Sequence, residues 1–140
     1  MQDDVIFRLM GIAFDLKQKE MAMQKLFGEF SMFATESIDH LFWVIHDSLG
    51  LPADNWREIE EKYTQSHPNA SHEDVYQYMS ENPEAYCSDS IWDTFHEFCR
   101  DQITKEEFLQ VAKETAAFFQ KPVEERMAIM KASAQQDWPE

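Results

Sequence analysis

The feature that most constrains the fold is an unbroken apolar run from Leu41 to Ile45, the longest in the sequence. Around it, apolar residues recur at steps of three and four, the spacing that lines one face of a helix. These residues are Ala34, Ile38, Leu41, Ile45 and Leu49. The other members of the run extend the apolar surface round the sides, as is typical of a helix that packs on several neighbours. Gly50 and Pro52 then end the pattern. We therefore predict a central helix at about residues 32–49.

The chain contains too few turn-forming residues for a β-rich fold. Its 140 residues include three glycines and five prolines, which leaves little material for tight turns. Good helix formers dominate most segments, and 44% hydrophobic residues are enough for a folded core. We predict an all-α protein, a single compact bundle of five to seven helices around the central one. Residues 1–134 form this single domain, and residues 135–140 form a frayed C-terminal tail.

The neighbours of the central helix follow from apolar spacing and capping residues. Residues 3–28 predict a long first helix that pairs with the central helix as an antiparallel hairpin. Its expected buried face includes Val5, Leu9, Ile12 and Leu16, and that of the central helix includes Ile38, Leu41 and Ile45. Later helices are predicted to start near Asp54, Ser71, Ser88 or Ser90, Thr104 and Pro122.

Features of secreted and membrane proteins are missing from the sequence. Charged residues interrupt the first twenty positions, so we expect no signal peptide. No apolar run approaches the roughly 20 residues that a membrane helix needs. Cys87 and Cys99 are too few for a disulfide framework. The expected location is therefore the cytoplasm.

Acidic residues outnumber basic ones by 27 to 12, a formal net charge of −15. The excess is concentrated in residues 51–107, where fourteen acidic and four basic residues give −10. Such a field repels phosphate backbones and anionic lipid but attracts basic protein surfaces. We therefore expect no direct binding to nucleic acid or membranes. Solubility alone is the simpler explanation of the same charge.

These observations predict a non-enzymatic module, without a cofactor, that binds a basic protein partner and inhibits, neutralises or chaperones it. Immunity proteins for nuclease toxins, secretion chaperones and phage-encoded nucleic-acid mimics are small acidic helical proteins of this physical type. No glycine-flanked serine or phosphate loop suggests an enzyme. The predicted partner-binding acids are Glu58, Glu60, Glu61, Glu73, Asp74, Asp93 and Glu97. The predicted aromatic anchors are Trp56, Tyr76 and Tyr78.

The alternative is a metal-binding helical bundle or enzyme that uses histidines and carboxylates. Acidic and histidine side chains follow one side of the central helix at Glu36, Asp39, His40 and Asp47. Di-iron bundles need a Glu-x-x-His pair on each of two helices, and this chain has no such pair. His96 and Cys99 lie one helical turn apart, but the close cysteine spacing of structural zinc sites is missing. The alternative metal ligands are Glu36, His40, His96 and Cys99.

Three further interpretations remain open. Residues 96–107 match a twelve-residue EF-hand loop only in its second half, with Ile103 at the eighth position and Glu107 at the twelfth. In the first half, Phe98 and Arg100 stand where calcium needs oxygen ligands. A capping box of Thr104 and Glu107 explains the same residues. The chain could also be a structural subunit that buries an apolar face in a homodimer or larger homo-oligomer. An adaptable binding groove could be lined by Met21, Met23, Met127 and Met130.

Overall fold

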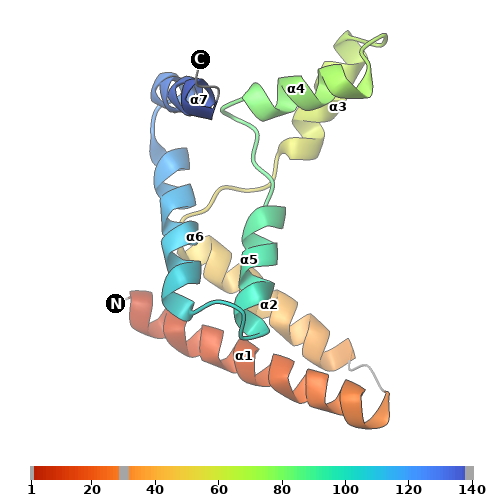
Figure 1. Cartoon of the computed structure of the whole chain (residues 1–140), viewed down its shortest axis with the longest axis vertical. Helices are drawn as coiled ribbons and strands as arrows, with labels where there is room; N and C mark the ends of the chain where they lie inside the picture. Colours follow the sequence, from red (N-terminus) through yellow and green to blue (C-terminus); the bar gives the residue numbers. More distant parts are fainter. Residues whose placement is uncertain (1, 29–31, 138–140) are drawn as a thin grey trace. The chain divides into compact units, whose positions relative to one another are not determined.

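A computed structural model describes residues 2–28 and 32–137. Within these residues the regular elements are all helices, joined by loops, and there is no strand (Figure 1). The helices are α1 (Gln2–Phe27), α2 (Met32–Ser48), α3 (Trp56–Ser66), α4 (His72–Glu81), α5 (Asp89–Cys99), α6 (Lys105–Gln120) and α7 (Val123–Asp137). The predicted all-α class and number of helices are confirmed. No helix within the described residues is long and apolar enough to cross a membrane.

The chain forms two compact units. Unit 1 comprises residues 1–51 and 89–116, and unit 2 comprises residues 52–88 and 117–140. Helix α6 starts in unit 1 and ends in unit 2. That residues 1–134 behave as one domain stays a prediction.

In unit 1, α2 supplies part of the core but is not its centre as predicted, because α1 contacts both α2 and α5, and Trp43 and Val44 of the apolar run are exposed. Helices α1 and α2 lie side by side and run antiparallel, and α5 packs on α1 (Figure 1). The Phe42 ring of α2 is fully buried, with its centroid 5.5 Å from that of Phe95 in α5. Phe95 in turn lies 5.4 Å from Phe108 of α6. This chain of three buried rings joins three helices into one core.

The predicted inward face of α1 is wrong by about one residue, whereas that of α2 is correct at Ile38 and Ile45 and wrong at Leu41. In α1, Val5 and Ile12 are about half exposed, whereas Ile6, Met10 and Ala13 are buried. Helix α1 carries two apolar stripes, and the buried one contains the small Ala13, which allows a neighbour to approach closely. In α2, Ile38 and Ile45 are buried as predicted, but Leu41 is half-buried and Phe42 takes the central position. Spacing alone fits either residue, and packing against Phe95 decides between them.

Unit 2 is built around the hairpin of α3 and α4, which lie side by side (Figure 1). Helix α3, every residue of which is described, buries no side chain. Met79 of α4 is buried, and so is Tyr86, whose ring packs edge-on against Phe119 at 5.0 Å. Little apolar surface is thus removed from water in this hairpin.

Two helix starts were predicted correctly from their capping residues. At α4, the Asp74 amide donates to Ser71 Oγ and the Ser71 amide donates to the Asp74 carboxylate, both at 3.1 Å. At α6, the Thr104 and Glu107 pair makes the same reciprocal bonds. Each box satisfies two amides that the first helical turn leaves unpaired.

The start of α3 and the end of α7 differ from expectation. Asp54 does not cap α3, because its carboxylate accepts from the Ser88 amide at 2.6 Å and from Ser88 Oγ at 2.9 Å. These bonds connect the two ends of the segment 52–88. Helix α7 continues to Asp137, past the predicted limit at residue 134. Residues 138–140 of the predicted tail lie outside the described residues.

Candidate functional site

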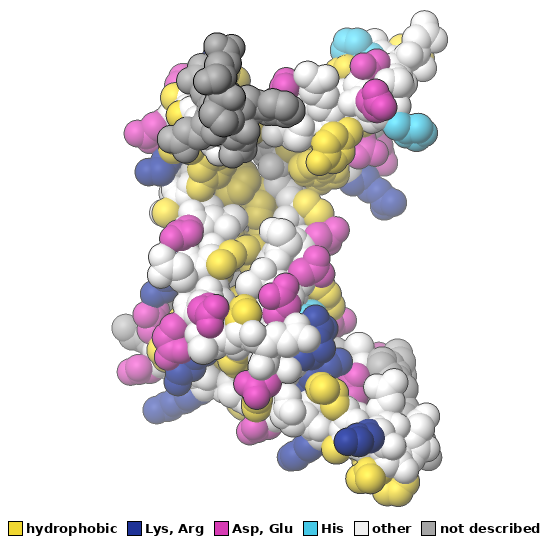
Figure 2. Space-filling model, viewed as in Figure 1, with side chains coloured by type: hydrophobic (Ala, Val, Ile, Leu, Met, Phe, Trp, Pro, Cys, Tyr) yellow, Lys and Arg dark blue, Asp and Glu magenta, His cyan; other side chains and the backbone are white. Residues whose placement is uncertain are grey.

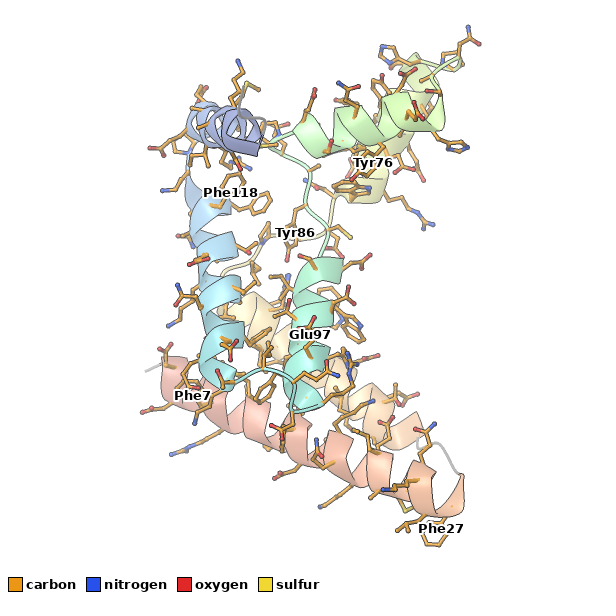
Figure 3. All side chains as sticks on the ribbon, viewed as in Figure 1. Phe7, Phe27, Tyr76, Tyr86, Glu97 and Phe118 are labelled. Carbon is orange, nitrogen blue, oxygen red and sulfur yellow. The ribbon has the colours of Figure 1, made fainter. Side chains whose placement is uncertain are left out.

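The structure places most of the predicted partner-binding acids on the hairpin of α3 and α4 in unit 2. Glu58, Glu60, Glu61, Glu73 and Asp74 are all exposed there. Asp93 and Glu97 instead belong to α5 of unit 1, where Glu97 is labelled in Figure 3. Figure 2 shows acidic side chains spread over the visible face instead of gathered in one patch. Charge alone therefore does not locate a binding site.

The hairpin segment, residues 54–84, contains eight acidic and two basic residues, a net charge of −6. One of its basic residues is already used, since Lys62 Nζ lies 3.2 Å from the Glu58 carboxylate. The two residues form an i,i+4 ion pair on α3. Being exposed, it contributes only a few tenths of a kcal/mol to stability. The remaining acids leave a strong negative potential round the hairpin.

The three predicted aromatic anchors share this hairpin but differ in exposure. Tyr76 is 73% exposed and projects from α4 in Figure 3. Trp56 and Tyr78 are half-buried. The Tyr78 ring stacks on Tyr63 of α3, with centroids 4.0 Å apart and planes 12° from parallel. Tyr63 also stacks on His67 at 4.3 Å. Ring stacking therefore holds the two helices of the hairpin together.

Beside this ring stack lies an open groove of about 680 Å³. It is lined by Tyr63, Gln77, Tyr78, Glu81, Asn82, Pro83, Glu84, Val123 and Met127, and we call it the tyrosine groove. Sequence reasoning found Tyr78 but missed Glu81 and Glu84. Glu81 could have been found from the sequence, because it is an acidic residue in the last turn of a predicted helix, where the helix dipole favours basic residues.

The loop that forms one wall of the tyrosine groove is held by hydrogen bonds from three sides. The Glu84 amide donates to Asn82 Oδ1 at 2.8 Å. The Glu84 carbonyl accepts from Asn55 Nδ2 at 2.8 Å, and the Pro83 carbonyl accepts from Arg126 Nη1 at 2.6 Å. These bonds fix the loop before any partner arrives, which lowers the entropic cost of binding there.

The alternative metal ligands are not brought together. Across residues 2–28 and 32–137, no three His, Cys, Asp or Glu side chains are grouped so that they could hold a metal ion. Glu36 and His40 are exposed, His96 is half-buried and Cys99 is buried. The EF-hand resemblance also has a structural explanation, because the Glu107 carboxylate is bonded to the Thr104 amide.

Unit 1 contains a small buried polar cluster near His96. Glu20 is buried and pairs with Lys17 at 3.2 Å. Burial lowers the pKa of His96, and the charges of Lys17 and Arg100 lower it further, while Asp39 and Asp93 act in the opposite direction. Among the described residues, Glu20 Oε2, Asp39 Oδ1 and His96 Nε2 have no hydrogen-bond partner. This partly buried environment therefore favours the neutral form of His96.

The methionines that were expected to line a groove are divided between the units. Met21 and Met23 are exposed on α1 of unit 1. Met127 of α7 is exposed and lines the tyrosine groove, whereas Met130 is half-buried.

Comparison of the chain with protein-family models, curated proteins and solved structures finds no match.

Proposed function

We propose that this protein is a non-enzymatic, acidic interaction module that binds a basic protein partner and thereby inhibits, neutralises or chaperones it. The observation that carries the proposal is the hairpin of α3 and α4, where exposed acids surround aromatic side chains. Charge attracts a basic surface over a distance, and aromatic rings supply the short-range contacts that determine affinity.

The proposal follows an analogy of physical type with immunity proteins, toxin inhibitors and phage-encoded nucleic-acid mimics, and it places the interaction in the cytoplasm. The same negative potential disfavours nucleic acid and anionic membranes as direct ligands. The proposal therefore concerns a protein partner with a positive surface.

The test starts with affinity capture from the native host and identification of the partner, followed by stopped-flow kinetics with the purified partner. The association rate should fall as salt shortens the Debye length from about 10 Å at 0.1 M to about 3 Å at 1 M. Replacing both Glu60 and Glu61 with lysine should slow association more than it speeds dissociation. The matched control reverses Asp15 and Glu36, two exposed acids of unit 1.

An association rate that changes neither with salt nor on reversal of Glu60 and Glu61 would show that the charge serves solubility alone.

A further inference from the structure

The tyrosine groove is lined by two acidic residues, Glu81 and Glu84, that form no ion pair within the described residues. Glu81 is the last residue of α4, a helix with no basic residue in its last turn. The carbonyl end of a helix carries a partial negative charge, so an acid there is disfavoured and a cation is favoured. Glu81 accepts a hydrogen bond from Gln77 Nε2 at 3.2 Å, but a neutral amide does not cancel its charge.

Glu84 adds a second free carboxylate on the neighbouring wall. Both residues are exposed, and neither forms an ion pair with any residue in the described part of the chain. Glu58, on the same hairpin, differs because Lys62 already pairs with it. The groove therefore offers two carboxylates to an external cation.

The other walls of the groove suit a cation that has flat apolar faces. The Tyr78 ring lies in the lining, parallel to Tyr63. Val123 and Met127 of α7 provide an apolar side against which an alkyl chain can pack. Within unit 2 the chain already uses such a contact, because the Arg126 guanidinium lies 5.4 Å from the centroid of Phe119.

From this arrangement we propose that the tyrosine groove binds an arginine-bearing segment of the basic partner. The guanidinium stacks on Tyr78 and pairs with Glu81 or Glu84, and its alkyl stem packs against Val123 and Met127. A volume of about 680 Å³ lies within the range of small-molecule sites, so it holds more than one side chain. This inference rests on the proposed function and specifies where the partner binds.

Arginine fits these walls better than lysine does. Its planar guanidinium stacks on aromatic rings and binds carboxylates through two parallel N–H bonds. A lysine ammonium is more strongly hydrated and makes only point contacts. The groove should therefore prefer arginine over lysine at equal charge, a preference that a diffuse acidic field cannot produce.

The test measures binding of three labelled nine-residue peptides, in which glycine alternates with arginine, lysine or citrulline, by fluorescence anisotropy at 50 mM salt. The arginine peptide should bind several-fold more tightly than the lysine peptide. The citrulline peptide keeps the shape of arginine without its charge, and should bind at least about tenfold more weakly than the arginine peptide.

Variants of the full chain locate the site. The double change Glu81→Gln with Glu84→Gln should weaken the arginine peptide about tenfold, and Tyr78→Leu should do the same. The control, Glu106→Gln with Glu114→Gln, removes the same charge from the exposed surface of α6 in unit 1 and should change affinity less than about twofold. Tyr78→Phe keeps the ring and should bind like the wild type, and circular dichroism checks that each variant folds.

A second readout follows methionine methyl groups by NMR. Addition of the arginine peptide should shift the signal of Met127 in the groove and leave that of Met10, buried in unit 1, unchanged. Shifts elsewhere with none at Met127 would place the peptide outside the groove.

Equal losses of affinity in the two glutamine double variants would overturn the proposed arginine site in the groove. Equal affinity for the arginine and lysine peptides would do the same. Either result would still allow a basic partner that binds through diffuse charge. Failure of both cationic peptides to bind would also overturn the groove. The proposed function is then decided separately, by the salt dependence of association with the captured partner.

Discussion

The two units carry nearly the same charge but use their aromatic residues differently. Unit 1 has fifteen acidic and seven basic residues, and unit 2 has twelve and five, so the net charges are −8 and −7. In unit 1, Phe42, Phe95 and Phe108 are buried at the centre of a core. In unit 2, Tyr63, Tyr76 and Tyr78 are half or mostly exposed. Unit 1 also exposes Phe27 and Trp43, so unit 2 is distinguished by having its exposed aromatic rings on one acidic hairpin.

This difference also predicts unequal stability. Buried apolar surface is the dominant favourable term in folding, and the hairpin of α3 and α4 buries little of it. Regions with few buried contacts open locally at a lower free energy than the core does. Unit 1 should therefore behave as the stable scaffold and unit 2 as the more readily opened one.

The largest expected effect concerns the two cysteines, one in each unit. Cys99 is buried in unit 1, and burial raises the pKa of its thiol to about 12, against a slight lowering by Lys17 and Arg100. At pH 8 its thiolate fraction is about a thousandfold below that of an ordinary thiol, and only the thiolate reacts. Cys87 is half-exposed in unit 2. A thiol reagent should therefore modify Cys87 rapidly and Cys99 more slowly by about a hundredfold or more, because burial also shields Cys99 from the reagent.

The raised pKa of Cys99 also makes the free energy of unfolding depend on pH. Since the neutral thiol of Cys99 is favoured in the folded state, its contribution to stability is fully present below pH 9 and is lost as the pH rises towards 12.

The Cys99→Ala and Cys87→Ala variants assign the fast and slow phases of thiol modification to the two cysteines. Two fast phases would show that unit 1 opens as easily as unit 2.

The next effect is truncation of the core of unit 1. Phe42→Ala removes a fully buried ring that contacts Trp92 and Phe95, and should lower the free energy of unfolding by about 3–5 kcal/mol. Leu41 is half-buried, so Leu41→Ala should cost clearly less. Urea denaturation measures both. A larger loss of stability for Leu41→Ala than for Phe42→Ala would show that Leu41 faces the core, as the apolar spacing predicted.

Truncation in unit 2 tests whether the two units unfold separately. Met79→Ala removes a buried side chain of α4 and should cost about 2–5 kcal/mol locally. Hydrogen exchange should speed up in α3 and α4, while the amides of α2 and α5 keep their protection. Equal acceleration of hydrogen exchange in both units would contradict the expected difference in stability and support a single cooperative domain.

The smallest effect concerns two equivalent caps. Ser71→Ala at α4 and Thr104→Ala at α6 each remove the hydroxyl from a complete capping box. Each should lower stability by about 1 kcal/mol. Hydrogen exchange should show the loss at Ser71 in the first turn of α4 and the loss at Thr104 across more of unit 1, because α6 contributes Phe108 to its core. A purely local effect at both sites would contradict this difference.

The sequence predicted features that depend on residues a few positions apart. The capping boxes at Ser71 and Thr104 were found because both partners lie within one helical turn. The buried face of α1 was missed because two apolar stripes compete and only tertiary packing chooses between them. The tyrosine groove was missed because Tyr63, Glu84 and Met127 come from separate parts of the chain and follow no periodic pattern. Partner binding stays a prediction for every residue named from the sequence.

Asn55 is not among the residues that line the tyrosine groove, yet the groove depends on its chemical identity. Its side-chain nitrogen donates to the Glu84 carbonyl at 2.8 Å, and its side-chain oxygen accepts from the Tyr86 amide at 2.6 Å. Aspartate has the same shape but no donor, so it would leave the Glu84 carbonyl facing another oxygen. Deamidation, a chemical ageing reaction of asparagine, makes that one-atom change. The lifetime of the tyrosine groove therefore depends on the chemical stability of one amide behind it.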